Sequence, residues 1–292
     1  MNQKIVFTIF LIISNNIAPA QPNNCCLVLF SHGIADTYKQ AFLYAKSYIY
    51  EGKKYTNDRY LFPCPFVTFN YPDATETIIR VNYKETSFGQ PNEIERLHSA
   101  YDKAKKWAFN RWDDCNIILF GLSRGASNLG IFAGTRTLEH VKAIILESPY
   151  YTMGEVIANM LQKNNLGWVP LSYGESVAEF IFKKYDRYGK SPATTVENIP
   201  SDMPILIVCS KEDGLVPYAS SINVYKKLLN SGHKHVYILI LDHGQHAKIL
   251  SGQDGQKYQS VVHAFYKKYN LPYDSSSAEE GENILLFCQP QI

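Results

Sequence analysis

The sequence has no excess of charge of either sign and no long apolar run after its first twenty residues. Its 292 residues carry 29 lysines and arginines against 27 acidic residues, which leaves a formal net charge of +2. Because these charges are scattered, we expect no basic surface for nucleic acid or anionic lipid. No later segment is long and apolar enough to cross a bilayer, so we expect no integral membrane segment in the mature chain.

Metal-binding motifs are also missing. No Cys-x-x-Cys pair or histidine cluster suggests a zinc site, and we expect neither a metal nor another cofactor. The six cysteines fit an oxidising compartment, although six cysteines allow fifteen pairings and the sequence does not choose among them. Cys115 and Cys209 lie on predicted core strands and are expected to be buried thiols.

The better candidates for disulfides are the other four cysteines, Cys25, Cys26, Cys64 and Cys288. Cys26 begins one predicted parallel strand, and Cys64 stands just before another. If those strands are neighbours, the two sulfur atoms start at the same end of the sheet.

The first twenty residues have the plan of a secretory signal peptide. Lys4 precedes a nine-residue apolar run over 5–13, a short polar stretch follows, and Ala18-Pro19-Ala20 offers small residues for cleavage. The run is too short to span a bilayer as a helix. We expect cleavage after Ala20 and a secreted or periplasmic mature protein. The alternatives are a buried N-terminal strand and an uncleaved anchor.

Short apolar runs rich in β-branched residues alternate with helix-like stretches along most of the chain. Continuous apolar runs are typical of parallel strands that are buried on both faces. The predicted strands are residues 26–31, 66–71, 116–120, 143–147, 204–209 and 236–241. The predicted helices are residues 36–50, 91–112, 123–134, 218–230 and 255–269. We therefore expect an α/β fold with a three-layer, doubly wound and mostly parallel sheet.

Residues 150–202 form a long insertion between two predicted strands. They carry two amphipathic stretches, 154–161 and 175–185, and the aromatic residues Tyr150, Tyr151, Trp168, Tyr173, Phe180 and Phe182. We expect most of these aromatics to pack a helical cap onto the sheet and a minority to line an apolar pocket. Residues 21–292 are thus expected to form one domain with 150–202 as its cap. The polar tail after Leu271 is expected either to be poorly ordered or to be held in place by a disulfide of Cys288.

A serine stands between two glycines in Gly121-Leu122-Ser123-Arg124-Gly125, after an apolar strand and before small residues that suit a helix. Such a stretch can be a simple turn. It also fits the nucleophile elbow G-x-S-x-G, a tight strand-to-helix turn that projects the serine above the sheet. The pattern arises by accident in about one chain in ten of this length, so its context must decide.

Chemistry-bearing residues follow other predicted strands as well. In a doubly wound sheet, ligands bind beyond the carboxyl ends of the strands. Ser123, then Asp213, then His243 and His246 each follow a predicted strand, in the order that the elbow motif requires of its partners. A serine hydroxyl becomes a good nucleophile when an imidazole takes its proton, and a buried carboxylate orients that imidazole.

Ser31-His32-Gly33-Ile34 follows the first predicted strand, where the elbow fold supplies a second oxyanion donor. With this turn, the chain resembles the α/β-hydrolase superfamily, and within it the Bem46-like and prolyl-oligopeptidase-like serine hydrolases with a modest cap. The resemblance rests on "VLFSHG", "FGLSRGAS", "LESPY", "PILIVCSKEDGLVPYASS" and "LILDHGQH", and it covers nearly the whole mature chain. The N-terminal part of the mature chain departs from the resemblance. We expect the sheet to begin near the mature N-terminus, without the two leading strands that many members have.

The resemblance implies a catalytic triad with Ser123 as nucleophile, His246 as base and Asp213 as the orienting carboxylate. Members usually place about three loop residues between the last strand and the histidine, which favours His246 over His243.

Two other acids compete with Asp213. Glu212 is adjacent, and Glu147 ends the preceding strand of the sheet. The family pattern of an aspartate shortly before Val-Pro favours Asp213, although an Asp-Gly pair also suits a plain turn.

The resemblance also implies an oxyanion hole made by the backbone N–H groups of Ile34 and Arg124. Each such donor is worth about 3 kcal/mol at the transition state. We expect the Arg124 side chain to pair with a carboxylate on the surface, and His32 to brace its own loop.

These observations together predict an exported serine hydrolase that cleaves a carboxylic ester through an acyl-Ser123 intermediate, with a small-molecule ester or acyl substrate. One alternative is a serine peptidase or amidase of the prolyl-oligopeptidase type, for which the sequence reveals no anchor for a substrate amine. The other is a non-catalytic binding protein on a hydrolase fold, against which the intact set of serine, aspartate and histidine argues.

Overall fold

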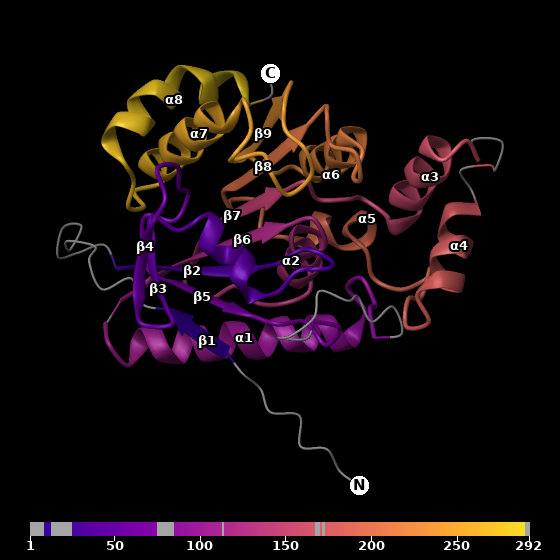
Figure 1. Ribbon diagram of the computed structural model, residues 1–292, viewed down its shortest axis with the longest axis horizontal. Helices are drawn as coiled ribbons and strands as arrows, with labels where there is room; N and C mark the ends of the chain where they lie inside the picture. Colours follow the sequence, from indigo (N-terminus) through magenta and orange to yellow (C-terminus); the bar gives the residue numbers. More distant parts are fainter. Residues whose placement is uncertain are drawn as a thin grey trace, which may run out of the picture.

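The computed structural model describes residues 9–12, 25–74, 85–112, 114–166, 170 and 173–289. Within them a seven-stranded sheet has the order β1-β5-β2-β6-β7-β8-β9 (Figure 1). Its strands are β1 (Ile9–Ile12), β2 (Cys26–Ser31), β5 (Phe66–Phe69), β6 (Asn116–Leu122), β7 (Val141–Glu147), β8 (Ile205–Ser210) and β9 (Val236–Leu241). Neighbours from β5 to β9 are parallel, and β1 is antiparallel to β5. The predicted mostly parallel sheet is confirmed.

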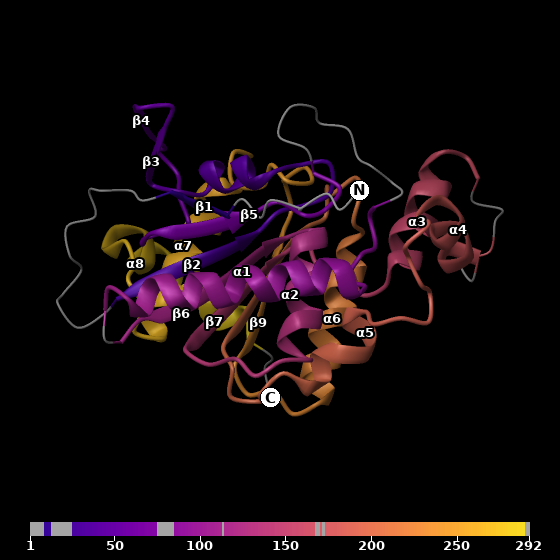
Figure 2. The same ribbon diagram turned by 90° about the horizontal axis from the view of Figure 1, so that it is seen from below.

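Helices cover both faces of this sheet. Leu27 and Leu29 of β2 face one apolar core, while Val28 and Phe30 face the other, because successive side chains of a strand point to opposite faces. The first core is closed by α1 (Pro91–Phe109), α2 (Arg124–Ala133) and α6 (Tyr218–Asn230). The second is closed by the 3₁₀ helix η1 (Tyr38–Leu43), α7 (Gly255–Lys268) and α8 (Ser275–Phe287). Figure 2 shows α1 in front of the strands and α7 behind them.

The direction of winding reverses between β2 and β6. These strands are neighbours, but β2 leads to β5 on one side while β6 leads to β7 on the other. Ligands of doubly wound sheets bind beyond the carboxyl ends of the strands at such a point. The turns that begin at His32, after β2, and at Ser123, after β6, therefore lie at this point of reversal.

The helix predicted over 36–50 is wrong. The short helix η1 is followed by a hairpin of β3 (Ser47–Tyr50) and β4 (Lys53–Thr56). The turn residues Glu51 and Gly52 have φ angles of 49° and 76°, as a two-residue hairpin turn requires. The rings of Phe42 and Tyr48 stack with centroids 4.5 Å apart, so aromatic packing holds the hairpin to η1.

The tail after Leu271 is neither loose nor pinned by a disulfide, in contrast to the prediction. It forms α8, whose first turn is capped by Asp274 through a 3.0 Å hydrogen bond from the Ser277 N–H. The helix lies close against α7, since a Cβ at Gly281 would lie 2.0 Å from the Ser260 carbonyl oxygen. Cys288, at its end, is a buried free thiol.

One of the predicted disulfide pairs is present. Cys26 and Cys64 are joined, with Cα atoms 5.8 Å apart, because β2 and β5 are parallel neighbours whose amino ends coincide. Cys115 and Cys209 are buried free thiols, as predicted.

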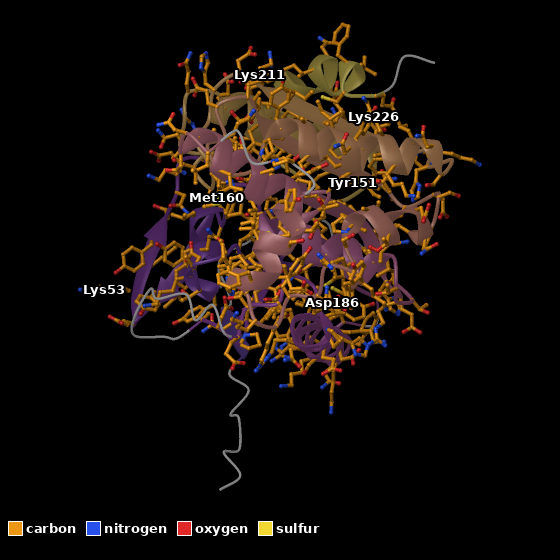
Figure 3. The ribbon with its side chains drawn as sticks, turned by 90° about the vertical axis from the view of Figure 1, so that its right-hand side faces the viewer. Lys53, Tyr151, Met160, Asp186, Lys211 and Lys226 are labelled. Carbon is orange, nitrogen blue, oxygen red and sulfur yellow. A yellow bond between two sulfur atoms is a disulfide. The ribbon has the colours of Figure 1, made fainter. Side chains whose placement is uncertain are left out.

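The segment 150–202 contains two kinds of structure. Helices α3 (Met153–Lys163) and α4 (Gly174–Ile181) pack on each other, set apart from α7 and α8 in Figure 1. The short α5 (Pro192–Thr195) and η3 (Val196–Asn198) pack instead against α2 and α6. Figure 3 turns the α3–α4 side toward the viewer and labels Met160 of α3 and Lys211, the residue after β8.

The aromatics of this segment divide in the same way. Tyr150 and Phe182 are buried in an apolar cluster with Phe88, whereas Tyr173 and Phe180 are exposed. Trp168 lies outside the described residues. The expected packing role therefore applies to only part of the set.

The structure describes four residues of the predicted signal peptide. These residues form β1, paired with β5 at the edge of the sheet. Residues 1–8 and 13–24, including the predicted cleavage site, lie outside the described part. Cleavage after Ala20 would remove this edge strand and leave the parallel strands paired with one another. None of the described helices has the length and apolar character needed to cross a bilayer.

Candidate active site

Ser123 occupies the tight turn between β6 and α2. Its φ of 54° and ψ of −118° lie in a region that non-glycine residues rarely adopt, which is typical of strained functional turns. A Cβ at Gly121 would lie 2.6 Å from the Ala126 Cα, and one at Gly125 would lie 2.0 Å from the Ser31 carbonyl oxygen. The glycines on both sides are therefore required by close backbone contacts, as the elbow interpretation predicts.

Ser123, His246 and Asp213 form a hydrogen-bonded chain. The Nε2 atom of His246 lies 2.9 Å from Ser123 Oγ, and its Nδ1 atom lies 2.7 Å from Asp213 Oδ2. A carboxylate only accepts hydrogen bonds, so Nδ1 donates to Asp213 and Nε2 is left to accept the serine proton. This arrangement can activate a hydroxyl group as a nucleophile.

Asp213 has two separate roles in this geometry. Its Oδ1 atom accepts 2.9 Å hydrogen bonds from the N–H groups of Leu215 and Val216, as in an aspartate turn. Its Oδ2 atom is left to hold His246. The turn interpretation and the catalytic interpretation of this aspartate are therefore compatible.

The rival residues His243 and Glu212 pair with each other instead. His243 Nδ1 lies 3.0 Å from Glu212 Oε1, and both side chains are largely exposed. The hydrogen bond to Glu212 raises the pKa of His243. The family spacing favours His246 over His243 as the base, and the structure brings His246 rather than His243 to Ser123.

Glu147 is buried at the end of β7. Its Oε2 atom accepts a 2.8 Å hydrogen bond from the Tyr258 hydroxyl. Burial raises the pKa of this carboxyl group to about 7. Asp213, not Glu147, is hydrogen bonded to His246.

The turn after β2 lies against the nucleophile. A Cβ at Gly33 would be 3.7 Å from the Ser123 Cβ, so the backbone of this turn is in contact distance of the serine. Arg124 is the first residue of α2, and N–H groups of a first helical turn have no intrahelical partner. The turn after β2, which carries Ile34, and Arg124 after β6 thus lie beside the serine from two different strand ends.

The Arg124 side chain is buried, contrary to the prediction of a surface ion pair. Its Nη1 atom lies 2.6 Å from Asp73 Oδ2 and 3.4 Å from Glu93 Oε1, and its guanidinium lies over the ring of Tyr71. Burial alone would raise the pKa of Asp73, but Arg124 lowers it. Sequence reasoning missed both carboxylates. The one available signal is that Asp73 follows β5 at the same edge of the sheet.

His32 braces its own loop, as expected. Its Nδ1 atom lies 2.8 Å from the Gly33 carbonyl oxygen, and its Nε2 atom lies 3.2 Å from the backbone nitrogen of Tyr71. Burial lowers the pKa of the imidazole to about 3, so His32 is neutral. Among the described residues, no group of three or more histidine, cysteine, aspartate or glutamate side chains is arranged to hold a metal ion.

Known proteins resemble this chain in sequence and in fold. The sequence model of the prolyl oligopeptidase family matches residues 93–271, more than half of the chain. No curated protein matches the sequence. Similar solved structures include an acylaminoacyl peptidase of Pyrococcus horikoshii, with 17% identity and a TM-score of 0.57 over 87% of this chain. This chain spans only 38% of that peptidase.

Two esterases are similar over most of both chains. An esterase of Pyrococcus furiosus has 16% identity and a TM-score of 0.54, over 84% of this chain and 82% of its own. Est1E of Butyrivibrio proteoclasticus, solved with ferulic acid bound, has 15% identity and a TM-score of 0.53, over 90% and 95%. These likenesses identify the α/β-hydrolase fold. Since the family model also spans most of the sequence, the chain belongs to the prolyl oligopeptidase family of serine hydrolases.

Proposed function

We propose that the protein hydrolyses carboxylic esters through an acyl-Ser123 intermediate. The observation that carries the proposal is the hydrogen-bonded chain from Ser123 through His246 to Asp213. His246 Nε2 takes the hydroxyl proton while Ser123 Oγ attacks the ester carbonyl carbon. The same histidine returns the proton to the departing alkoxide oxygen, and the alcohol leaves. Water then repeats the sequence on the acyl-enzyme and releases the acid.

The negative charge of each tetrahedral intermediate is held by the backbone N–H groups of Ile34 and Arg124. Two strand ends supply these donors, so their separation is set by the paired strands β2 and β6 rather than by a free loop. Removing one such donor from a hydrolase typically costs about 3 kcal/mol in the transition state.

Two observations support an ester with an apolar acyl group. An apolar cluster that includes Phe88, Tyr150 and Phe182 lies near the site. Ile34, which follows Gly33, and Leu215, two residues after Asp213, pack against it. This chain also spans most of the length of the two similar esterases but less than half of the similar peptidase, which favours an ester substrate. We propose that residues 150–202 cap this site within a single domain over 21–292.

A peptidase or amidase is the second candidate. The matched family model and the likeness to an acylaminoacyl peptidase favour it. The chemistry at Ser123 would be the same, with an amine in place of the alcohol as the leaving group.

Export is part of the proposal. The signal-like sequence of residues 1–20 and the Cys26–Cys64 disulfide both suit an oxidising compartment outside the cytosol.

The test is a panel of p-nitrophenyl esters graded by acyl length, run beside aminoacyl arylamides. We expect kcat/KM for the best ester to exceed that for the best arylamide. The reverse order would make the peptidase the better assignment. Labelling of Ser123 by a fluorophosphonate probe separates both from a protein without serine hydrolase chemistry.

A further inference from the structure

The buried guanidinium of Arg124 contacts the turn that carries the second oxyanion donor. Its Nη2 atom donates a 3.2 Å hydrogen bond to the Gly33 carbonyl oxygen. The carbonyl group of Gly33 and the N–H group of Ile34 belong to one planar peptide unit, in which they point in opposite directions. A group that fixes the Gly33 carbonyl therefore also fixes where the Ile34 N–H points.

His32 supplies a second donor to the same oxygen. Its Nε2 atom accepts the Tyr71 N–H, so the ring proton is on Nδ1, which donates at 2.8 Å to the Gly33 oxygen. On the other side of the glycine, the Gly33 N–H donates at 2.8 Å to Gln40 Oε1. Gly33 has no side chain to restrict its backbone. Buried groups instead hold the peptide units on both sides of it.

Arg124 is itself held rigidly. Asp73 and Glu93 bind its Nη1 atom, while Glu93 also accepts 2.7 Å and 2.9 Å hydrogen bonds from Asn128 Nδ2 and the Ser87 N–H. Burying a charged group is costly unless it is paired and hydrogen bonded, and here the guanidinium binds two carboxylates and the Gly33 carbonyl oxygen. The carboxylates leave Nη2 directed at Gly33.

We infer that Arg124 and His32 are positioning residues of the oxyanion hole, which hold the Gly33 carbonyl so that the Ile34 N–H points at the oxygen of the intermediate on Ser123. The inference rests on the proposed function. Arg124 thus serves both halves of the hole, with its own N–H as one donor and its side chain as the support of the other. A cation on the carbonyl oxygen also polarises the peptide and strengthens its N–H as a donor.

The test uses Arg124→Lys and a matched pair at His32. Lysine keeps the positive charge but lacks the planar fork that reaches both carboxylates and Gly33. Both His32→Asn and His32→Leu lose the Tyr71 contact, but only asparagine keeps a donor toward Gly33. Fluorophosphonate titration counts the active sites, so kcat is expressed per labelled serine.

We expect Arg124→Lys to keep KM within about twofold and to lose kcat about 10- to 100-fold, part of the loss seen when an oxyanion donor is removed. Affinity for a trifluoromethyl ketone, which forms an oxyanion on Ser123, should fall by a similar factor. His32→Leu should lose about tenfold more kcat than His32→Asn.

A lower melting temperature with unchanged kcat per labelled serine would mean that these residues only stabilise the fold, and would overturn the inference. Equal kcat for His32→Asn and His32→Leu would do the same, even if Arg124→Lys fails to fold. Absence of labelling in the unaltered protein would instead refute the proposed function.

A second and independent observation concerns two cysteines beside the known disulfide. The Asn116 N–H donates at 2.9 Å to the Cys25 carbonyl, and Cys26 pairs with Asn116 in the sheet, so Cys25 and Cys115 stand side by side. Their sulfur atoms are 2.6 Å apart, with Cys115 buried. The two thiols are unbonded in this structure, but sulfur atoms this close need only a small approach to reach the length of an S–S bond, about 2.05 Å.

We propose that Cys25 and Cys115 form a second disulfide in the exported protein. The two thiols transfer two electrons and two protons to a small-molecule disulfide RSSR, which becomes two RSH, and an S–S bond forms between the cysteines. The Cys25–Cys115 disulfide would then link the start of β2 to the start of β6. The Cys26–Cys64 disulfide links it to the residues before β5, at the same end of the sheet.

The experiment counts thiols in the protein secreted by an oxidising host, denatured without reductant and alkylated with iodoacetamide. With both disulfides present, only Cys209 and Cys288 are alkylated. In a Cys26→Ser/Cys64→Ser variant, mass spectrometry should find the Cys25 peptide cross-linked to the Cys115 peptide. Alkylation of Cys25 and Cys115 in the unaltered oxidised protein would overturn the proposal.

Discussion

His246 Nε2 lies 2.9 Å from Ser123 Oγ, although 123 residues separate the two in the chain. Their strands are not neighbours, because β7 and β8 lie between β6 and β9. Three strand spacings amount to about 14 Å, so a residue at the end of β9 must be carried across the sheet edge by its loop. His243 stands too near the strand end for this, and it pairs with Glu212 instead.

Replacing Ser123 by alanine is expected to abolish ester hydrolysis and fluorophosphonate labelling. The hydroxyl group is the nucleophile, and the elbow backbone does not depend on it. The variant should keep its circular dichroism spectrum and its melting temperature within a few degrees. Full activity in a folded Ser123→Ala protein would contradict the proposed function as a whole.

Replacing His246 by alanine should be nearly as damaging. Loss of the base removes proton abstraction and should lower kcat by several orders of magnitude with KM little changed. The double variant with Ser123→Ala should be scarcely worse than either single variant, because the two residues act as a unit. His243→Ala is the matched control and should keep a substantial fraction of kcat. An inactive His243→Ala beside an active His246→Ala would assign the base to the other histidine.

Local patterns predicted the features that depend on neighbouring residues. The strands at 26–31 and 236–241 are found where their apolar runs lie, since both faces of each strand are covered. The elbow around Ser123 could be predicted because its glycines and serine are adjacent in the chain. His246 could be singled out only through a family pattern, since the path of its loop is not encoded in its spacing.

Features that depend on distant partners could not be predicted in this way. Arg124 was expected at the surface because Asp73 and Glu93 lie 51 and 31 residues away in the chain. The hairpin over β3 and β4 was missed because Glu51-Gly52 is a weak turn signal beside the helical spacing of the preceding residues. Its stability comes from rings that stack across the hairpin and onto η1.

Gly125→Ala should destabilise the protein strongly. The added methyl group would lie 2.0 Å from the Ser31 carbonyl oxygen and would force β2 and α2 apart. We expect a loss of about 3 kcal/mol or more in the free energy of unfolding, measured in urea. Gly214→Ala is the control, because its Cβ would meet only Lys163 Nζ at 4.0 Å. Equal stability of the two variants would show that the elbow tolerates a side chain at residue 125.

N-terminal sequencing of the protein secreted by an export-competent host should start at Gln21. The motivating features are Lys4, the apolar run over 5–13 and the small residues before the cleavage site. An Ala20→Asp variant should block cleavage, because an acidic side chain replaces the small residue that the cleavage site requires. Recovery of a chain that starts at Met1 from the cytoplasm would contradict export and would leave β1 in the sheet.

The stability of the protein should depend on pH through His263. This buried imidazole donates at 3.1 Å to the Tyr60 carbonyl and accepts at 3.1 Å from the Asp274 N–H. Burial lowers its pKa from 6.5 to about 4. Between these values the unfolded chain binds a proton that the folded chain does not. The stabilisation is therefore complete above pH 6.5 and is lost as the pH falls toward 4.

His263→Gln removes this titration while keeping a donor for Tyr60. We expect the difference in free energy of unfolding between the unaltered protein and this variant to shrink by up to about 1.4 kcal/mol per pH unit between pH 6.5 and 4. His243→Gln is the control of opposite sign. The hydrogen bond that His243 donates to Glu212 raises the pKa of His243, so its contribution is present at low pH and lost as the pH rises above 6.5. A stability difference for His263→Gln that stays constant across this range would show that His263 is protonated within the folded protein.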